Sequence, residues 1–436
     1  MTEREPAATG LAVLDLARRG RFAEIRGLFA PALRPLVTAE TLQAAWSAEL
    51  ERHGAVSAIG VPVSEPDAAG VVAVKIPVTC EHGALTVIVS VHAGSGLLTG
   101  IQLAPADAAR PVRPWQPPSY ANPGAFDEQE VAVGSGTLAV PGTLSLPRRP
   151  GPLPAVVLLA GSGPNDRDET IGRNKPFKDL AWGLVGRGVA VLRFDKVTRA
   201  HPGEVAKMRD FTVADEYVPH GLAALDLLRR HPAVDAGRVF VLGHSLGGTI
   251  APRVAAQEPS VAGLVLLAGG TQPLHWSAVR QLRHLASLNP ATAAASQPAL
   301  EAITRQAQRV DDPGLSPATP AAELPFGLPP PYWLDLRDYD PVATAAQLDR
   351  PILILQGGRD YQATVAQDLA DWKAGLAHLP DVTIRIHAAD NHFFFPGTGP
   401  SAPNENEPAQ HMDPAVVAEI ADWLTSPGHN RVDPGG

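Results

Sequence analysis

The stretch Arg238-Val-Phe-Val-Leu-Gly243-His244-Ser245-Leu246-Gly247-Gly248 decides the fold. Its first half is an apolar run typical of a buried strand, and the residues after Ser245 follow the pattern of a helix. Between them lies G-x-S-x-G, whose two glycines let backbones come close at a sharp turn from strand to helix. The serine hydroxyl would project at the start of the helix, where the helix dipole favours negative charge. This context makes the short motif specific.

From about residue 126 to the end, the chain alternates predicted strands and helices. Several strands, such as 156–159 and 352–355, are apolar at every position, which is typical of a parallel sheet covered on both faces. We therefore predict an α/β fold with right-handed crossovers. The predicted strands are 130–133, 136–146, 155–160, 189–195, 238–242, 262–268, 351–356 and 382–387. The predicted helices are 177–186, 214–230, 245–257, 365–378 and 414–424.

The domain organisation is predicted from changes in composition and in the spacing of apolar residues along the chain. Residues 1–103 have helical spacing up to about residue 50 and then β-rich runs at 71–78 and 84–92, which predicts a small α+β domain. Residues 104–125 contain six prolines and predict a stiff linker. Residues 126–436 form the α/β domain. About eighty residues separate its strands near 268 and 351, so we predict a helical cap insertion at about 271–345, above the strand ends where ligands bind.

Composition excludes several classes of protein. The 436 residues carry 36 basic and 45 acidic side chains, a net charge of −9, which argues against nucleic-acid binding. The single cysteine, Cys80, excludes an intramolecular disulfide and cysteine-rich metal sites. No apolar run is long enough for a membrane helix, and the polar start does not read as a signal peptide, so we expect a cytoplasmic protein without a membrane partner. The spacing of Glu81, His82 and His92 indicates no metal site.

A serine needs a base and an orienting acid to become a nucleophile. Both should follow Ser245 in the chain, at the ends of later strands. Asp360 follows the predicted strand 351–356, and His392 follows 382–387, so we predict Ser245, Asp360 and His392 as the catalytic group. The alternatives are His387 and His411 as the base, and Asp390, Asp338 and Asp340 as the acid.

Oxyanion stabilisation requires backbone N–H donors near the attacked carbonyl. We expect one from Leu246 and one from Ser162, whose neighbours Gly161 and Gly163 let the backbone approach a substrate. We assign four residues to the substrate-binding region: Gly161, Gly163, Arg167 and His244. Arg167 either binds a substrate carboxylate or, as we prefer, orders the loop through ion pairs. His244 is expected to point away from the nucleophile and to pack or form hydrogen bonds.

These motifs together resemble bacterial α/β-hydrolase-fold esterases similar to dienelactone hydrolases and serine aminopeptidase-like hydrolases. The resemblance rests on Gly243–Gly247, Gly161–Asp168, Asn174–Asp179, Val191–Lys196, Gln356–Asp360 and Asn391-His392. Many such proteins have an N-terminal domain of unknown function, which residues 10–103 resemble. The resemblance implies carboxylic ester hydrolysis by Ser245, Asp360 and His392 without a cofactor. In two respects the chain departs from the pattern: Ala160 replaces a histidine common in relatives, and no export signal is evident.

The leading hypothesis is therefore hydrolysis of a small-molecule ester, lactone or other acyl substrate through an acyl-enzyme on Ser245. Three alternatives stay open. The same residues could carry out intramolecular acyl transfer, lactonisation or cyclisation in a biosynthetic pathway. The protein could also be an aminopeptidase-like amide hydrolase, or a non-catalytic binding protein on the same fold. The N-terminal domain has three interpretations: a module for homodimerisation, a shield over the active site, or a separate ligand binder.

Overall fold

The computed structural model describes residues 5–66, 70–106, 115–288 and 290–426. Its contacts divide the chain into two compact units. Unit 1 contains Met1–Arg113 and Ala278–Pro330, and unit 2 contains Pro114–Ser277 and Pro331–Gly436. The sequence-based boundaries at 103, 125 and about 271–345 stay a prediction, and residues 107–114 of the expected linker lie outside the described residues.

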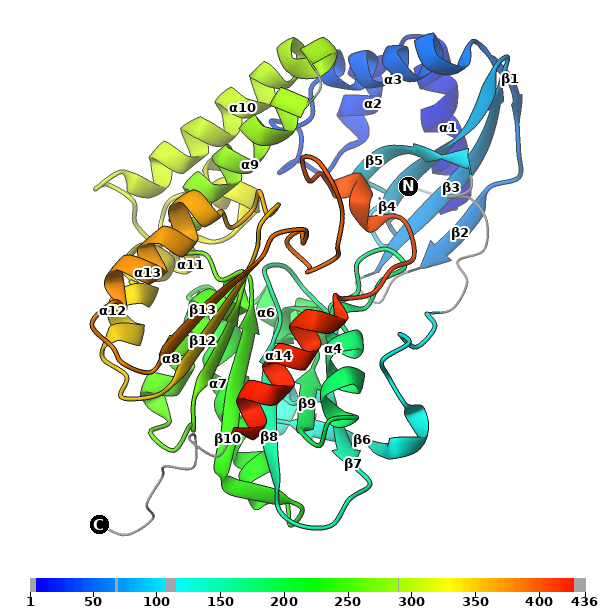
Figure 1. Ribbon diagram of the computed structural model, residues 1–436. Coiled ribbons are helices and arrows are strands. Elements are labelled where there is room, and N and C mark those ends of the chain that lie inside the picture. The colour runs from blue at the N-terminus through cyan, green and yellow to red at the C-terminus, as the bar shows by residue number, and fades with distance from the viewer. Residues whose placement is uncertain (1–4, 67–69, 107–114, 289, 427–436) are drawn as a thin grey trace. The chain divides into compact units, whose positions relative to one another are not determined.

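Unit 1 is an α+β unit in which helices pack against an antiparallel sheet (Figure 1). The sheet has the order β1-β3-β4-β5, with β2 paired to β3. Its helices are α1 (Pro6–Arg18), α2 (Phe22–Leu28) and α3 (Ala39–His53), and its strands are β1 (Val56–Ile59), β2 (Val63–Pro66), β3 (Val71–Cys80), β4 (Gly83–His92) and β5 (Leu98–Pro105). Thr38 caps α3 by accepting the Thr41 N–H, as its position before the helix predicts.

The inserted segment also belongs largely to unit 1. Its two long helices are α9 (Leu274–Leu288) and α10 (Pro290–Asp311). Helix α10 runs beside α3, where the Thr41 hydroxyl donates to the Ala295 carbonyl over 2.5 Å. Between α1–α3 and the sheet, unit 1 contains an open pocket of about 510 Å³ with a mainly apolar lining.

Unit 2 is built on an eight-stranded sheet with the order β13-β12-β11-β10-β8-β9-β7-β6. The strands from β13 to β9 pair in parallel, whereas β7 pairs antiparallel with β9, and β6 pairs antiparallel with β7. The strands are β6 (Phe126–Val133), β7 (Val140–Pro147), β8 (Leu153–Leu159), β9 (Ala190–Phe194), β10 (Val234–His244), β11 (Leu264–Leu267), β12 (Ile352–Gly357) and β13 (Val382–His387).

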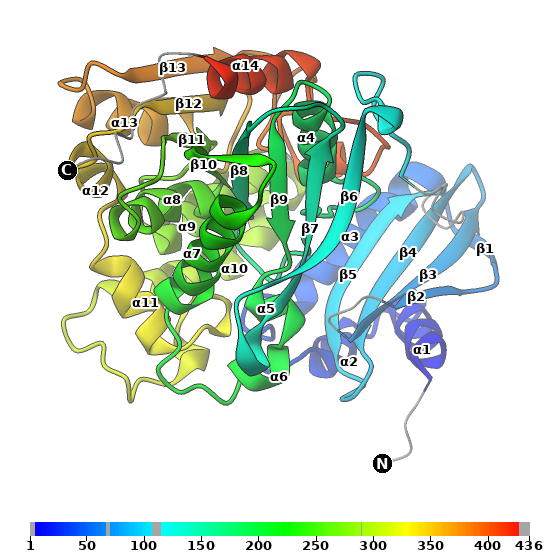
Figure 2. The ribbon, with the colours of Figure 1, turned by 90° about the horizontal axis from the view of Figure 1, so that it is seen from below.

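Helices cover both faces of this sheet (Figure 2), which explains why its central strands are apolar at every position. One face packs against α4 (Pro176–Val185) and α14 (Pro414–Thr425), and the other against α7 (Val213–Arg230) and α8 (Leu246–Gln257). The shorter helices are α5 (Val197–Ala200), α6 (Pro202–Val205), α11 (Pro330–Arg337), α12 (Pro341–Ala346) and α13 (Ala370–Gly375). No helix of the described residues combines the length and apolarity required to cross a membrane.

Strands β6 and β10 each begin four residues before the predicted strands at 130 and 238, and two further elements differ for a local reason. The helix expected at 365–378 is a π-helical turn, Val365–Leu369, followed by the shorter α13. The buried Asp368 carboxylate accepts the Thr364 and Thr271 N–H groups, which ties the start of this turn to the loop after β11. The strand expected from 136 begins at Val140, because Gly136 has φ +67° and opens a 3₁₀ turn.

The topology places the candidate site at one edge of the sheet. Strands β8, β10, β12 and β13 are parallel, so their carboxyl ends lie at the same edge. The loops that carry Gly161, Ser245, Asp360 and His392 leave these four ends. Ligands of open α/β sheets bind at this edge.

Candidate active site

Ser245 occupies a strained turn between β10 and α8. Its backbone has φ 53° and ψ −123°, a left-handed φ that non-glycine residues rarely adopt. A Cβ on Gly243 would lie 2.1 Å from the Gly247 carbonyl oxygen, and a Cβ on Gly247 would lie 2.1 Å from the Leu159 carbonyl oxygen. Both glycines therefore have the steric role that the motif predicts, and they let the turn pack against the end of β8.

His392 and Asp360 form a buried hydrogen-bonded pair. Nδ1 of His392 lies 2.8 Å from Oδ2 of Asp360, and the two residues are 4% and 6% exposed. Asp360 is itself held by four donors, since it also accepts the Gln362 and Ala363 N–H groups on Oδ1 and the Gln356 amide on Oδ2. Because a carboxylate only accepts, Nδ1 carries the proton and Nε2 is left as a base.

His244 links the His392 loop to the strand end that precedes Ser245. Nε2 of His244 lies 2.9 Å from the His392 carbonyl oxygen, and the two ring centroids are 4.8 Å apart. The described part of the chain shows no hydrogen bond between Ser245 Oγ and His392. Such bonds tighten when substrate binds, so their geometry without substrate does not decide the role of a residue.

Both ring nitrogens of His244 face acceptors. Nδ1 lies 2.9 Å from Oε1 of Glu169, and Nε2 faces a carbonyl. Burial alone would lower the pKa of His244, but the Glu169 carboxylate and the His392 carbonyl raise it above its ordinary value. Two acceptors and a raised pKa favour the protonated form of His244, which pairs with Glu169 and has both of its nitrogens bonded inside the protein.

The loop after β8 is fixed on both sides of Gly161. Its N–H donates to Oε1 of Glu169 over 2.6 Å. Its carbonyl accepts from the Lys196 ammonium at 2.9 Å and from the Tyr217 hydroxyl at 2.8 Å. Because the N–H of Gly161 is occupied, the next N–H along the loop, that of Ser162, is better suited to bind an oxyanion.

The ammonium group of Lys196 is buried, which is uncommon for a lysine side chain. Burial lowers its pKa, and the Glu216 carboxylate, 3.1 Å away, opposes that shift. Tyr332 donates to the other oxygen of Glu216 over 2.7 Å. Lys196 and Glu216 thus form a buried ion pair, and Lys196 holds the loop through the Gly161 carbonyl.

Arg167 is committed to ion pairs within unit 2. Its guanidinium bonds to Asp195 at 3.0 Å and to Glu130 at 2.5 Å, and it also donates to the Thr143 hydroxyl. This arrangement favours the loop-ordering interpretation of Arg167. Ser162 and Gly163 are exposed in the same loop, and Gly163 has φ +87°.

Four of the five alternative bases and acids have other partners, and the fifth, Asp390, is a buried acid whose carboxylate forms no hydrogen bond among the described residues. His387 bonds to Glu419 at 3.1 Å, and His411 bonds to the buried Asp179 at 3.1 Å. Asp340 caps α12, and Asp338 pairs with Arg337. In the described residues, Asp360 is the acid bonded to His392.

Sequence reasoning missed the residues that hold the loops. Glu169, Lys196, Tyr217 and Gln356 all bond to the candidate site, although the sequence assigned none of them a role there. The sequence contained two signals. Lys196 is the last residue of the motif Val191–Lys196, and Glu169 directly follows the charged run Asp166–Asp168. Neither signal identifies the atom that each side chain contacts.

Comparison with known proteins gives consistent matches. The profile of the alpha/beta hydrolase family matches residues 156–420. Esterase EstD of Thermotoga maritima is 37% identical over 308 residues, which are 70% of this chain and 69% of that protein. The 2,6-dihydropseudooxynicotine hydrolase of Paenarthrobacter nicotinovorans is 30% identical over 139 residues, 32% of this chain and 34% of that protein. The structure of Est1E from Butyrivibrio proteoclasticus aligns with a TM-score of 0.43 at 16% identity, over 68% of this chain and 97% of Est1E. The chain belongs to the alpha/beta hydrolase family.

Proposed function

We propose that this protein is a serine hydrolase that cleaves carboxylic esters of small molecules through an acyl-enzyme on Ser245. The observation that carries the proposal is the bonded pair His392–Asp360, held through His244 beside the strained turn of Ser245. The similarity to Esterase EstD over 69% of that protein supports the ester as the substrate class.

Each step of the reaction has a candidate group. Nε2 of His392 takes the proton of the Ser245 hydroxyl while Oγ attacks the ester carbonyl carbon. The oxyanion is stabilised by the N–H groups of Leu246 and Ser162. Leu246 is the first residue of α8, where an N–H has no acceptor within the helix. His392 then gives its proton to the leaving alcohol, and water releases the acid by the reverse sequence.

The proposal is tested first by covalent labelling. A fluorophosphonate probe should label the wild type and fail to label Ser245→Ala. Ser135→Ala is a matched control, because Ser135 is exposed and caps no helix through its side chain. Absence of labelling in the wild type would favour a non-catalytic binding protein.

Substrate class is tested with a panel of p-nitrophenyl esters of graded length, a lactone and an aminoacyl amide, on the wild type and His392→Ala. Hydrolysis of the esters by the wild type, lost in the variant, supports the proposal. Turnover of the amide but of no ester would favour a peptidase, and cyclised product from a hydroxy ester would favour intramolecular acyl transfer.

The remaining expectations are part of the same proposal. Of the three interpretations of the N-terminal α+β domain, homodimerisation is the one that we put to the test, and we expect a cytoplasmic protein without affinity for nucleic acid, consistent with the net charge of −9. Light scattering of the full chain tests the first point: a monomer at micromolar concentration would contradict it.

A further inference from the structure

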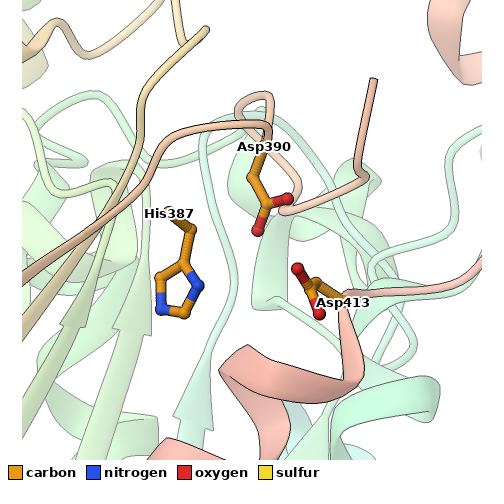
Figure 3. A group of neighbouring side chains, drawn as sticks. All are labelled: His387, Asp390 and Asp413. Atoms are coloured by element: carbon orange, nitrogen blue, oxygen red, sulfur yellow. The ribbon is translucent and has the colours of Figure 1, made fainter. Parts of the chain in front are cut away.

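We propose that His387, Asp390 and Asp413 form a binding site for one divalent transition-metal ion of the Zn²⁺ type. The site lies at the base of the loop that carries His392. It goes beyond ester hydrolysis, because none of its three residues takes part in the proposed reaction. Figure 3 shows the two carboxylates facing each other, with the imidazole of His387 beside them.

The three residues come from three different elements. His387 ends β13, Asp390 lies in the following loop, and Asp413 is the N-cap residue of α14. One donor atom from each lies within 4.8 Å of the others. Ligands of a tetrahedral ion with bonds of about 2.0–2.2 Å are roughly 3.4 Å apart, so small side-chain rotations would complete the contact.

Asp390 is the observation that points to a cation. Its side chain is 0% exposed, and neither of its carboxylate oxygens has a hydrogen-bond donor. Burying an unpaired carboxylate is costly, and such groups bind metals, pair with charges or take up a proton.

The neighbouring cation is bonded elsewhere. The guanidinium of Arg359 donates to Glu405 and to the carbonyls of Gly399, Thr398 and Ala389. Only its backbone N–H contacts Asp390, at the carbonyl oxygen. The facing pair Asp390–Asp413 therefore lacks a neutralising side chain among the described residues.

The partner of His387 favours a metal over a shared proton. Nε2 of His387 lies 3.1 Å from Oε2 of Glu419, which holds the Nε2 proton and leaves Nδ1 as a lone-pair donor. A metal-binding histidine usually donates its other ring N–H to a carboxylate in this way. One imidazole and two carboxylates suit Zn²⁺ better than Ca²⁺, which takes 6–8 oxygen ligands.

The test is Zn²⁺ binding by the metal-stripped full chain, measured by calorimetry and by elemental analysis after gel filtration. We expect one equivalent in the wild type, a raised melting temperature with Zn²⁺, and loss of both in Asp390→Asn and Asp413→Asn. Glu419→Gln should weaken binding about tenfold, since it removes the carboxylate that orients His387 and leaves all three ligands in place, although it also breaks the ion pair with Arg385. Asp422→Asn, an exposed acid on the same helix, is the matched control and should bind like the wild type.

Two results would overturn the proposal. Equal Zn²⁺ binding by the wild type and a folded Asp390→Asn would mean that the ion binds elsewhere or not at all, and that Asp390 holds a proton. Binding of Ca²⁺ but not Zn²⁺ would contradict the assigned class of metal. Melting curves in chelator show whether each variant is folded. The same titration in Ser245→Ala keeps the outcome independent of catalysis.

Discussion

His392 and Asp360 are 32 residues apart in the chain, yet Nδ1 of the first donates to Oδ2 of the second over 2.8 Å. Asp360 accepts three further hydrogen bonds, so its carboxylate has little freedom to turn. The imidazole is consequently held in the tautomer whose Nε2 is a base. This restraint is what the proposed reaction requires, because a rotated or flipped ring could not take the serine proton.

Replacing this carboxylate with an amide should abolish most of the activity without unfolding the protein. In Asp360→Asn the amide can present its NH₂ group to His392 and favour the wrong tautomer, so we expect kcat to fall about 10³–10⁴-fold. Steady-state kinetics with a p-nitrophenyl ester measure the effect. Asp338→Asn is the control, because this exposed alternative acid pairs with Arg337. Activity lost in Asp338→Asn and kept in Asp360→Asn would contradict the assignment.

The turn at Ser245 should tolerate no side chain at position 247. The added Cβ of Gly247→Ala would lie 2.1 Å from the Leu159 carbonyl oxygen, a backbone atom of a buried strand that cannot rotate away. We expect a loss of about 3 kcal/mol or more in the free energy of unfolding, measured in urea. Gly27→Ala is the comparison, because no atom lies within 4 Å of its added Cβ. It lies within α2, so it should be neutral or slightly stabilising. Equal stability of the two variants would argue against this steric account.

The ion pair between Glu169 and His244 predicts a pH-dependent stability. The pKa of His244 is raised in the folded protein. The ion pair therefore contributes fully to the free energy of unfolding below the unfolded pKa of about 6.5, and this contribution is lost as pH rises through the folded pKa. Glu169→Gln keeps an acceptor for the Gly161 N–H but removes the charge. We expect it to lose about 2–3 kcal/mol near pH 6 and progressively less at higher pH. Unfolding curves from pH 6 to 9 check this, and parallel curves for the two proteins would contradict it.

Local patterns predicted several elements of the α/β unit well, because strands and helices differ in the spacing of their apolar residues. The strand expected at 382–387 is β13, residue for residue, and the helix expected at 177–186 is α4 shifted by one. Strand β1 was not predicted, since three of its four residues are exposed and no alternation marks it. The association of the inserted helix α10 with α3 also escaped prediction, because it depends on a contact between residues 254 positions apart.

The candidate site, like the fold, was predicted only in part from the sequence. Ser245, Asp360 and His392 were predicted because chain order and strand ends restrict where such groups can stand. Their supports were not, since a buried lysine or glutamate reveals its partner only in three dimensions. His244 illustrates the difference: its position beside the serine is plain in the sequence, whereas its ion pair with Glu169 brings together residues 75 positions apart.

The support beneath the oxyanion loop provides a last prediction. Tyr217 receives a hydrogen bond from Lys196 and donates to the Gly161 carbonyl, directly before Ser162. Tyr217→Phe removes that bond while leaving the ring, so the Ser162 N–H should be held less accurately where the oxyanion forms. One misplaced oxyanion donor costs up to about 10²–10³ in kcat, and we expect roughly tenfold here because Lys196 still holds Gly161. KM should change little, since the interaction acts on the transition state.

A merely structural effect is excluded by a matched variant. Tyr332→Phe removes a hydroxyl that bonds to Glu216, the partner of Lys196, and that forms no hydrogen bond with the loop among the described residues. Both variants delete one buried hydroxyl and should lose similar stability, about 1–2 kcal/mol. Only Tyr217→Phe should lower kcat. Either of two other results would contradict the prediction. An equal loss of kcat in both variants would mean that the Lys196–Glu216 pair is responsible. No loss of kcat in either would mean that Ser162 is positioned without Tyr217.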